Sequence, residues 1–186
     1  MRWQTEANRR YYQEMVKGLA QPKVLLVYFA REDDEIPGLI ERDKNNFAWA
    51  NPGVEIEYLV ATEGDFAKQV QESDVILLAG GETDKLIATV KRTGIDLKQA
   101  FEGKIVSGSS AEAYLIAEWY YTNNDREIRR GLGLLPIAVW AHYRPEKGSE
   151  YDISESEIET IEKEMLTHVS EDKFIKIPEQ EMVVLQ

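Results

Sequence analysis

Residues 23–30 of the chain read KVLLVYFA, a nearly unbroken apolar run. A strand that is covered by helices on both faces has this composition, because neither face meets water. Outward from this run, residues 74–79 read DVILLA and residues 104–107 read KIVS. The three segments predict buried strands of a parallel sheet.

Helical patterns separate these strands. The N-terminal segment has apolar residues at helical spacing, at Tyr12, Met15, Val16 and Leu19. We expect another strand over residues 54–61. Further helices are expected over residues 37–50, 66–71, 85–91 and 97–101. The alternation of strand and helix predicts an α/β fold with a mainly parallel sheet.

The C-terminal half is less regular. Residues 132–142 are apolar and interrupted by glycine and proline, which predicts one or two short strands. Residues 154–157 fit a capping box, and the apolar face of the helix behind it consists of Ile158, Ile161, Met165 and Val169. We expect closing strands over residues 173–177 and 182–185.

Length and composition bound the domain organisation and the partners. The 186 residues contain no long linker, so we expect a single domain over residues 1–186, with residues 1–22 as an N-terminal helical extension. The net charge of -12 repels phosphate backbones, so nucleic acid is not an expected partner. Whether the chain is a monomer or a homodimer stays open.

The chain lacks cysteine and lacks a long uncharged run, which excludes several kinds of catalytic site and a membrane span. The chain has no cysteine, which excludes disulfides, thiolate metal sites and cysteine nucleophiles. No uncharged run reaches the ~18 residues that a membrane span requires. We therefore expect a cytoplasmic protein with no membrane partner.

Two loops that follow predicted strands have the composition of a ligand site, which in open α/β sheets lies at the carboxyl ends of the strands. In residues 80–83, GGET, the glycine pair lets backbone N–H groups approach a ligand. Residues 108–113, GSSAEA, fit a nucleophile elbow, in which a serine occupies a sharp turn between strand and helix. By spacing alone, an ordinary turn also explains each loop.

A serine nucleophile needs a base, and the chain has two histidines. His168 lies near the end of the expected C-terminal helix, where the helix dipole explains a histidine. His142 follows an apolar segment at an expected strand end, as a catalytic base would. Asp125 lies between Ser110 and His142 and can orient the imidazole, although a polar turn also explains it.

Together these segments resemble the peptidase E and cyanophycinase family of serine peptidases. Residues 80–83 are similar to the family's Gly-Gly-Asn-Thr loop, and residues 108–113 to its Gly-x-Ser-Ala-Gly-Ala elbow, which assigns the nucleophile to Ser110. Three later segments resemble the family's Thr-Asn-Asp stretch, its run ending in Pro-His-aromatic and its Leu-Pro-Glu-Gly segment, namely residues 122–125, 132–143 and 177–180.

The resemblance implies a flavodoxin-like three-layer sandwich with a mainly parallel central sheet, the class I glutamine amidotransferase-like fold. It implies a dipeptidase-like serine peptidase acting on small peptides without metal or cofactor. Ser110, His142 and Asp125 would form the catalytic triad. The N–H groups of Gly81 and Ala111 would bind the oxyanion.

The chain departs from the family pattern at Glu82, where the family has asparagine, and at Glu112, where it has glycine. We expect both carboxylates, with Arg144, to lie where substrate binds. Peptidase E removes N-terminal aspartate from dipeptides, which requires a cation for the substrate carboxylate. The segment after the histidine is longer and basic in peptidase E, whereas residues 148–159 here form a short, acidic segment. We therefore expect the reaction class of the family without its preference for aspartate.

Two other functions stay open. A catalytically degenerate binding or regulatory domain would keep the fold, and Glu82 and Glu112 favour it. A flavodoxin-like nucleotide- or flavin-binding protein is disfavoured, because no Walker-type or dinucleotide loop follows the strand at residues 23–30. The acidic residues 32–34 that do follow it would repel a phosphate.

Overall fold

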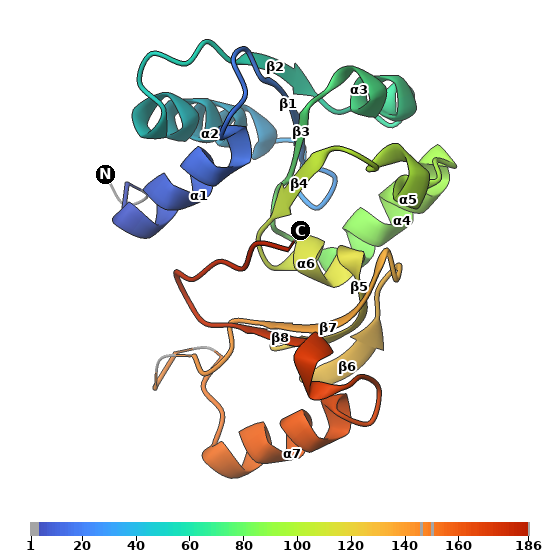
Figure 1. Ribbon diagram of the computed structural model, residues 1–186. Helices are drawn as coiled ribbons and strands as arrows, with labels where there is room; N and C mark the ends of the chain where they lie inside the picture. The colour runs from blue at the N-terminus through green and yellow to red at the C-terminus, as the bar shows by residue number, and fades with distance from the viewer. Residues whose placement is uncertain (1–3, 146, 150, 186) are drawn as a thin grey trace. The chain divides into compact units, whose positions relative to one another are not determined.

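The computed structural model describes residues 4–145, 147–149 and 151–185 (Figure 1). The chain divides into two compact units, Met1–Ala111 and Glu112–Gln186. Each unit contains a four-stranded sheet. The single domain expected over residues 1–186 stays a prediction.

The sheet of the first unit is entirely parallel. Its strand order is β2-β1-β3-β4, with bounds Glu57–Val60, Lys23–Val27, Val75–Leu78 and Ile105–Gly108. The residues of β1 and β3 are buried on both faces, apart from the partly exposed Lys23 at the start of β1. The apolar runs are therefore central strands, as their composition predicted, although each strand is shorter than its run.

Helices cover both faces of this sheet (Figure 1). One core cluster joins α1 and α2 to alternate residues of the strands, such as Val24, Leu26 and Val75. Leu25 and Ile76, which point to the opposite face, are also fully buried. The helices of this unit are α1 (Glu6–Val16), α2 (Ile36–Ala50), α3 (Phe66–Glu72), α4 (Thr83–Thr93) and α5 (Leu97–Ala100).

A buried carboxylate joins α1 and α2 to Tyr28, the residue that follows β1. Asp43 of α2 is only 1% exposed. Its oxygens accept hydrogen bonds from the hydroxyls of Tyr12 at 2.8 Å and Tyr28 at 2.9 Å, and Arg42 pairs with the same carboxylate. Burial, followed by the Asp43 charge, raises the pKa of both tyrosines, which keeps them protonated as donors. Helix α1 is therefore built into the core of the first unit.

The sheet of the second unit is mixed. Its strand order is β6-β5-β7-β8, with bounds Glu127–Arg130, Ala117–Thr122, Leu135–Ala141 and Phe174–Ile177. Strand β5 pairs antiparallel with β6 and parallel with β7, and β7 pairs parallel with β8. Across the two sheets the strands are mainly parallel and flanked by helices, so the α/β, flavodoxin-like fold class is confirmed.

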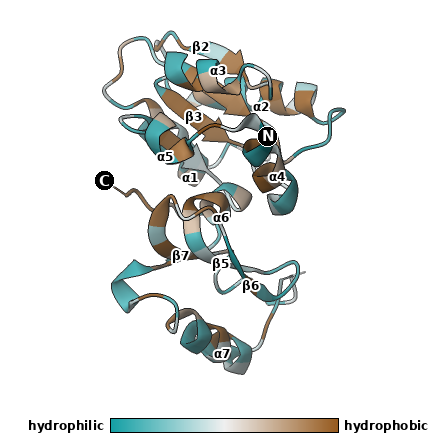
Figure 2. Ribbon diagram, turned by 90° about the vertical axis from the view of Figure 1, so that its right-hand side faces the viewer, coloured by the Kyte–Doolittle hydropathy of each residue, from teal (hydrophilic) through white to brown (hydrophobic). Residues whose placement is uncertain are grey.

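Helix α6 (Ala111–Ile116) precedes this sheet, and α7 (Glu155–Met165) packs on it. The capping box expected at residues 154–157 is present, with the Ser154 hydroxyl accepting from Glu157 N–H and the Glu157 carboxylate from Ser154 N–H. Trp140, Met165 and Phe174 share one core cluster. Figure 2 shows polar residues along much of α7.

The structure differs from the sequence-based expectations in this half of the chain. Residues 182–185 form no strand, and Val183, Val184 and Leu185 are about half exposed. An apolar segment becomes a strand only where a neighbouring edge accepts its backbone hydrogen bonds. Strand β6, EIRR, was not expected, because an edge strand with polar side chains has no apolar pattern. Among the described residues, no helix has the length and apolar character that crossing a membrane requires.

Candidate active site

Ser110 occupies a strained turn. Strand β4 ends at Gly108, helix α6 begins at Ala111, and Ser110 between them has φ of 66°. This left-handed conformation costs a residue with a Cβ atom roughly 1–3 kcal/mol, and such strain is concentrated at functional sites. The strand, sharp turn and helix of a nucleophile elbow are therefore all present at Ser110.

The Gly80–Gly81 loop leaves the same edge of the first sheet. Strands β3 and β4 are parallel neighbours with Leu78 opposite Gly108, so the chain leaves both strands at their shared carboxyl end. A Cβ atom on Gly81 would lie 2.4 Å from the carbonyl oxygen of Ala30, so only glycine fits this position. Glu82 donates its backbone N–H to the same oxygen at 3.0 Å, and its side chain is exposed.

His142 lies at the carboxyl end of β7, and its φ of 56° is also left-handed. Its imidazole is 28% exposed, and Nδ1 contacts Oε1 of Glu179. Strand β8 pairs with β7 in register Ala141 opposite Ile177, so Glu179 leaves the sheet beside His142. The chain thus brings together an imidazole and a carboxylate that are 37 positions apart.

Glu179 is a functional candidate that residue-by-residue reasoning missed. A single glutamate in a C-terminal loop carries no local signal. The similarity of residues 177–180 to the Leu-Pro-Glu-Gly segment pointed to this place without assigning a role to its carboxylate.

Asp125, the expected orienting acid, lies in the turn between β5 and β6. Its side chain is 49% exposed, and Oδ2 is 3.2 Å from Nη1 of Arg129. Its carboxylate thus belongs to a surface ion pair between residues four positions apart. The carboxylate that contacts Nδ1 of His142 is that of Glu179.

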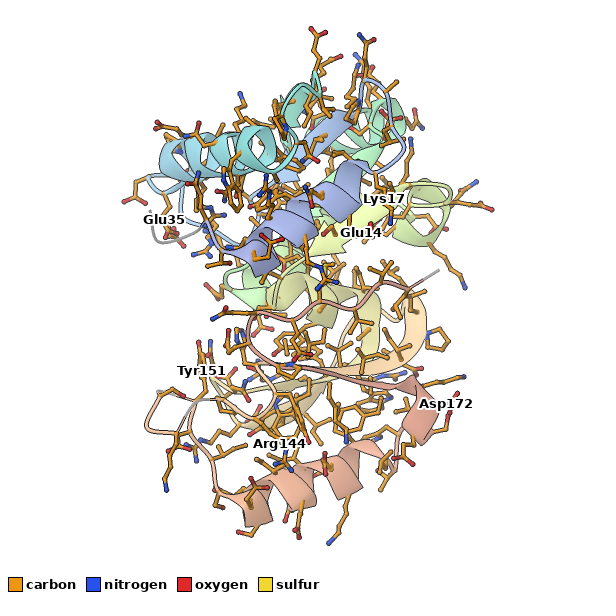
Figure 3. All side chains as sticks on the ribbon, turned by 60° about the vertical axis from the view of Figure 1, so that its left-hand side comes forward. Glu14, Lys17, Glu35, Arg144, Tyr151 and Asp172 are labelled. Atoms are coloured by element: carbon orange, nitrogen blue, oxygen red, sulfur yellow. The ribbon has the colours of Figure 1, made fainter. Side chains whose placement is uncertain are left out.

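The segment after His142 is fastened to α7. The Tyr143 hydroxyl donates to Oε1 of Glu162 at 2.7 Å, and Lys176 donates to the same oxygen at 2.6 Å. These two bonds lower the pKa of Glu162. Arg144 donates to the Tyr143 hydroxyl at 3.0 Å and to Glu155 at 3.1 Å. Figure 3 shows Arg144 beside α7.

The two carboxylates expected near the substrate differ in exposure. Glu82 is exposed, whereas Glu112, in the first turn of α6, is 0% exposed. A fully buried side chain differs from the substrate-accessible carboxylate that we expected at Glu112. Two further glutamates, at positions 146 and 150, lie outside the described residues.

His168 has a structural explanation. It lies just beyond the end of α7, and its ring stacks on Trp119 at 3.8 Å between centroids and 16° between planes. The guanidinium of Arg130 lies 5.0 Å from the centroid of the same indole. The stack accounts for this histidine without a catalytic role.

Comparison with known families decides the class of the protein. The model of peptidase family S51 matches residues 2–186. The chain belongs to peptidase family S51. Membership makes this S51 chain a serine-type peptidase, and the resemblance of its motifs to the peptidase E family is confirmed.

Solved structures agree with the S51 fold. The chain is similar to a protein from Listeria monocytogenes EGD-e assigned to peptidase E, with a TM-score of 0.59 and 20% identity over 92% of this chain and 85% of that one. It is also similar to a peptidase from an acI-B1 Actinobacterium, with a TM-score of 0.56 and 16% identity over 84% of this chain and 68% of that one. No curated protein matches the chain.

Proposed function

We propose that the protein hydrolyses small peptides with Ser110 as nucleophile and His142 as general base. The observation that carries this proposal is the left-handed backbone at Ser110, in a strand-to-helix turn of a chain that belongs to family S51. A residue other than glycine is strained there. Because the strain is unfavourable for folding, a requirement of the reaction explains its presence best.

We further propose that Glu179 orients the imidazole. Its contact with Nδ1 supports this role, since a carboxylate on Nδ1 selects the tautomer in which Nε2 carries no proton and acts as the base. Asp125 was the acid expected from the motif order. Its pairing with Arg129 favours Glu179 over Asp125 as the third member.

The reaction follows from these roles. His142 Nε2 takes the proton of Ser110 Oγ while Oγ attacks the carbonyl carbon of the scissile peptide bond. The N–H groups of Gly81 and Ala111 would stabilise the oxyanion, each by about 3–4 kcal/mol. The C–N bond then breaks, His142 returns the proton to the leaving amine, and water hydrolyses the acyl-enzyme.

A serine-reactive fluorophosphonate probe tests this function. We expect the wild-type protein to be labelled at Ser110 and to cleave members of a dipeptide library. Ser110→Ala should lose both properties. Ser109→Ala changes the exposed neighbouring serine and should keep both. Labelling that persists in Ser110→Ala, or occurs at Ser109, would contradict the assignment.

A catalytically degenerate binding domain is the second candidate. The buried Glu112 favours it, because the family has glycine at this place in its elbow. On this alternative the wild-type protein is not labelled, and Glu112→Gly gains labelling at Ser110. On the peptidase proposal, the wild-type protein is labelled without this substitution.

A further inference from the structure

Asn123 is a buried side chain at the end of β5 whose amide reaches the neighbouring strand β7. It is 8% exposed. Its Nδ2 donates to the carbonyl oxygen of Ala141 at 3.1 Å and to that of His142 at 3.3 Å. Its Oδ1 accepts from Nε1 of Trp140 at 3.0 Å.

These partners determine which way the amide faces. An indole N–H can only donate, and a backbone carbonyl oxygen can only accept. Rotating the amide by 180° would therefore break all three bonds. The amide oxygen and nitrogen of Asn123 thus bond to three consecutive residues, 140–142, the last of which is the proposed base.

The backbone at His142 needs such support. Strand pairing between β7 and β8 ends at Ala141, and His142 then turns into the left-handed region with φ of 56°. The next N–H, that of Tyr143, donates to the carbonyl oxygen of Ile177 at 3.1 Å. The peptide unit between His142 and Tyr143 is therefore held from one side by Asn123 and from the other by β8.

We propose that Asn123 is a positioning residue for the catalytic histidine. It would fix the orientation of the peptide plane that follows His142. The strained backbone at His142 would then hold the imidazole in the orientation in which Nδ1 contacts Glu179. This inference rests on the proposed function, in which His142 is the base. A displacement of a catalytic group by about 1 Å can cost on the order of 100-fold in rate.

Two substitutions remove the donor. Asn123→Asp keeps the size of the side chain and an acceptor for Trp140, but places an oxygen against the two carbonyl oxygens. Asn123→Ser is neutral and too short to reach both carbonyls, so it avoids a buried charge if the aspartate variant fails to fold. In each variant we expect labelling of Ser110 by the fluorophosphonate to slow about 10- to 100-fold per folded molecule.

Two controls separate positioning from general stability. Trp140→Phe removes the indole donor and leaves both Nδ2 bonds of Asn123 in place, so it should lower the thermal midpoint but keep the labelling rate within about twofold. Asn124→Asp puts the same charge on the exposed neighbour in the same turn and should change neither quantity.

Steady-state kinetics on an Ala-Leu dipeptide supply a second readout. A displaced base should lower kcat by a similar factor and leave KM within about twofold, because Asn123 is buried and its bonds are to protein groups. Asn123 variants that are less stable but label and turn over at the wild-type rate would overturn the inference alone. A wild-type protein that is not labelled at Ser110 would overturn both this inference and the proposed function.

Discussion

Ser110 illustrates a conflict between folding and function within one residue. Its φ of 66° favours glycine, which has no Cβ atom to collide with the backbone. A hydroxyl is nevertheless present at this point of the elbow. The local backbone is thus less stable than it would be with glycine, and the proposed reaction requires the hydroxyl.

This conflict predicts that an inactive variant with glycine at position 110 is more stable than an inactive variant with alanine there. Ser110→Gly should be inactive but more stable than Ser110→Ala by about 1 kcal/mol, because glycine adopts the left-handed conformation without strain. Urea denaturation of both variants measures the difference. Equal stabilities would show that the turn is not strained in solution.

The two histidines should respond differently to removal. His142→Ala should abolish hydrolysis and leave the fold intact, because it removes the proposed base. His168→Ala should keep the rate and cost about 1 kcal/mol through loss of the stack on Trp119. Measured kcat and thermal midpoints of both variants provide the check, and an equal loss of activity would refute the assignment.

At the scale of elements, the Asp43 network connects α1 and α2 to the chain at the end of β1. Tyr12 and Tyr28 come from different elements and donate to the two oxygens of one carboxylate. Because their pKa values are raised, the stability of this junction depends on pH in the alkaline range. Above the ordinary tyrosine pKa of about 10, the unfolded chain releases protons that the folded chain keeps, so stability falls as pH rises.

Tyr12→Phe should make this alkaline loss less steep. At neutral pH the variant should lose about 1.5–3 kcal/mol, the contribution of a hydrogen bond to a charged group. Above pH 10, its stability should fall more slowly than that of the wild type, by up to about 1.4 kcal/mol per pH unit. Urea denaturation between pH 7 and about pH 11 measures both effects.

A matched variant exists for this test. Phe47→Leu alters the ring that packs edge-on against Tyr12 at 4.8 Å between centroids. It should lower stability at every pH without changing the alkaline slope, because it removes no titrating group. A Tyr12→Phe slope equal to that of the wild type would contradict the role of burial in the tyrosine pKa.

At the scale of the whole molecule, the net charge of -12 opposes an acidic substrate. Glu82 is exposed next to Gly81. The Arg144 guanidinium already donates hydrogen bonds to Glu155 and to the Tyr143 hydroxyl. Two like charges about 4 Å apart repel by ~4 kcal/mol at an effective dielectric constant near 20. An N-terminal aspartate at the site would meet this repulsion.

We therefore predict that Asp-Leu is a poorer substrate than Ala-Leu or Lys-Leu. The advantage of Lys-Leu should shrink with added salt, because salt screens its attraction to the acidic protein. Values of kcat/KM for the three dipeptides at two ionic strengths decide the matter. A preference for Asp-Leu that weakens with salt would contradict the prediction and indicate a cation at the site.

Local patterns in the sequence were sufficient for much of the fold. The apolar runs 23–30 and 74–79 predicted β1 and β3, because burial on both faces leaves no polar positions. The capping box at residues 154–157 predicted the start of α7, since its hydrogen bonds join residues three apart. The small residues around Ser110 similarly predicted a tight turn. These features depend on neighbours within a few residues.

Only the tertiary structure decided which distant residues meet. Glu179 reaches His142, and Asn123 reaches its backbone, because β5, β7 and β8 are neighbours in one sheet. No local periodicity specifies that order, which comes from the packing of whole strands. For the same reason the apolar residues 182–185 were wrongly expected to form a strand: a side-chain pattern is local, whereas the partner edge that completes a strand is not.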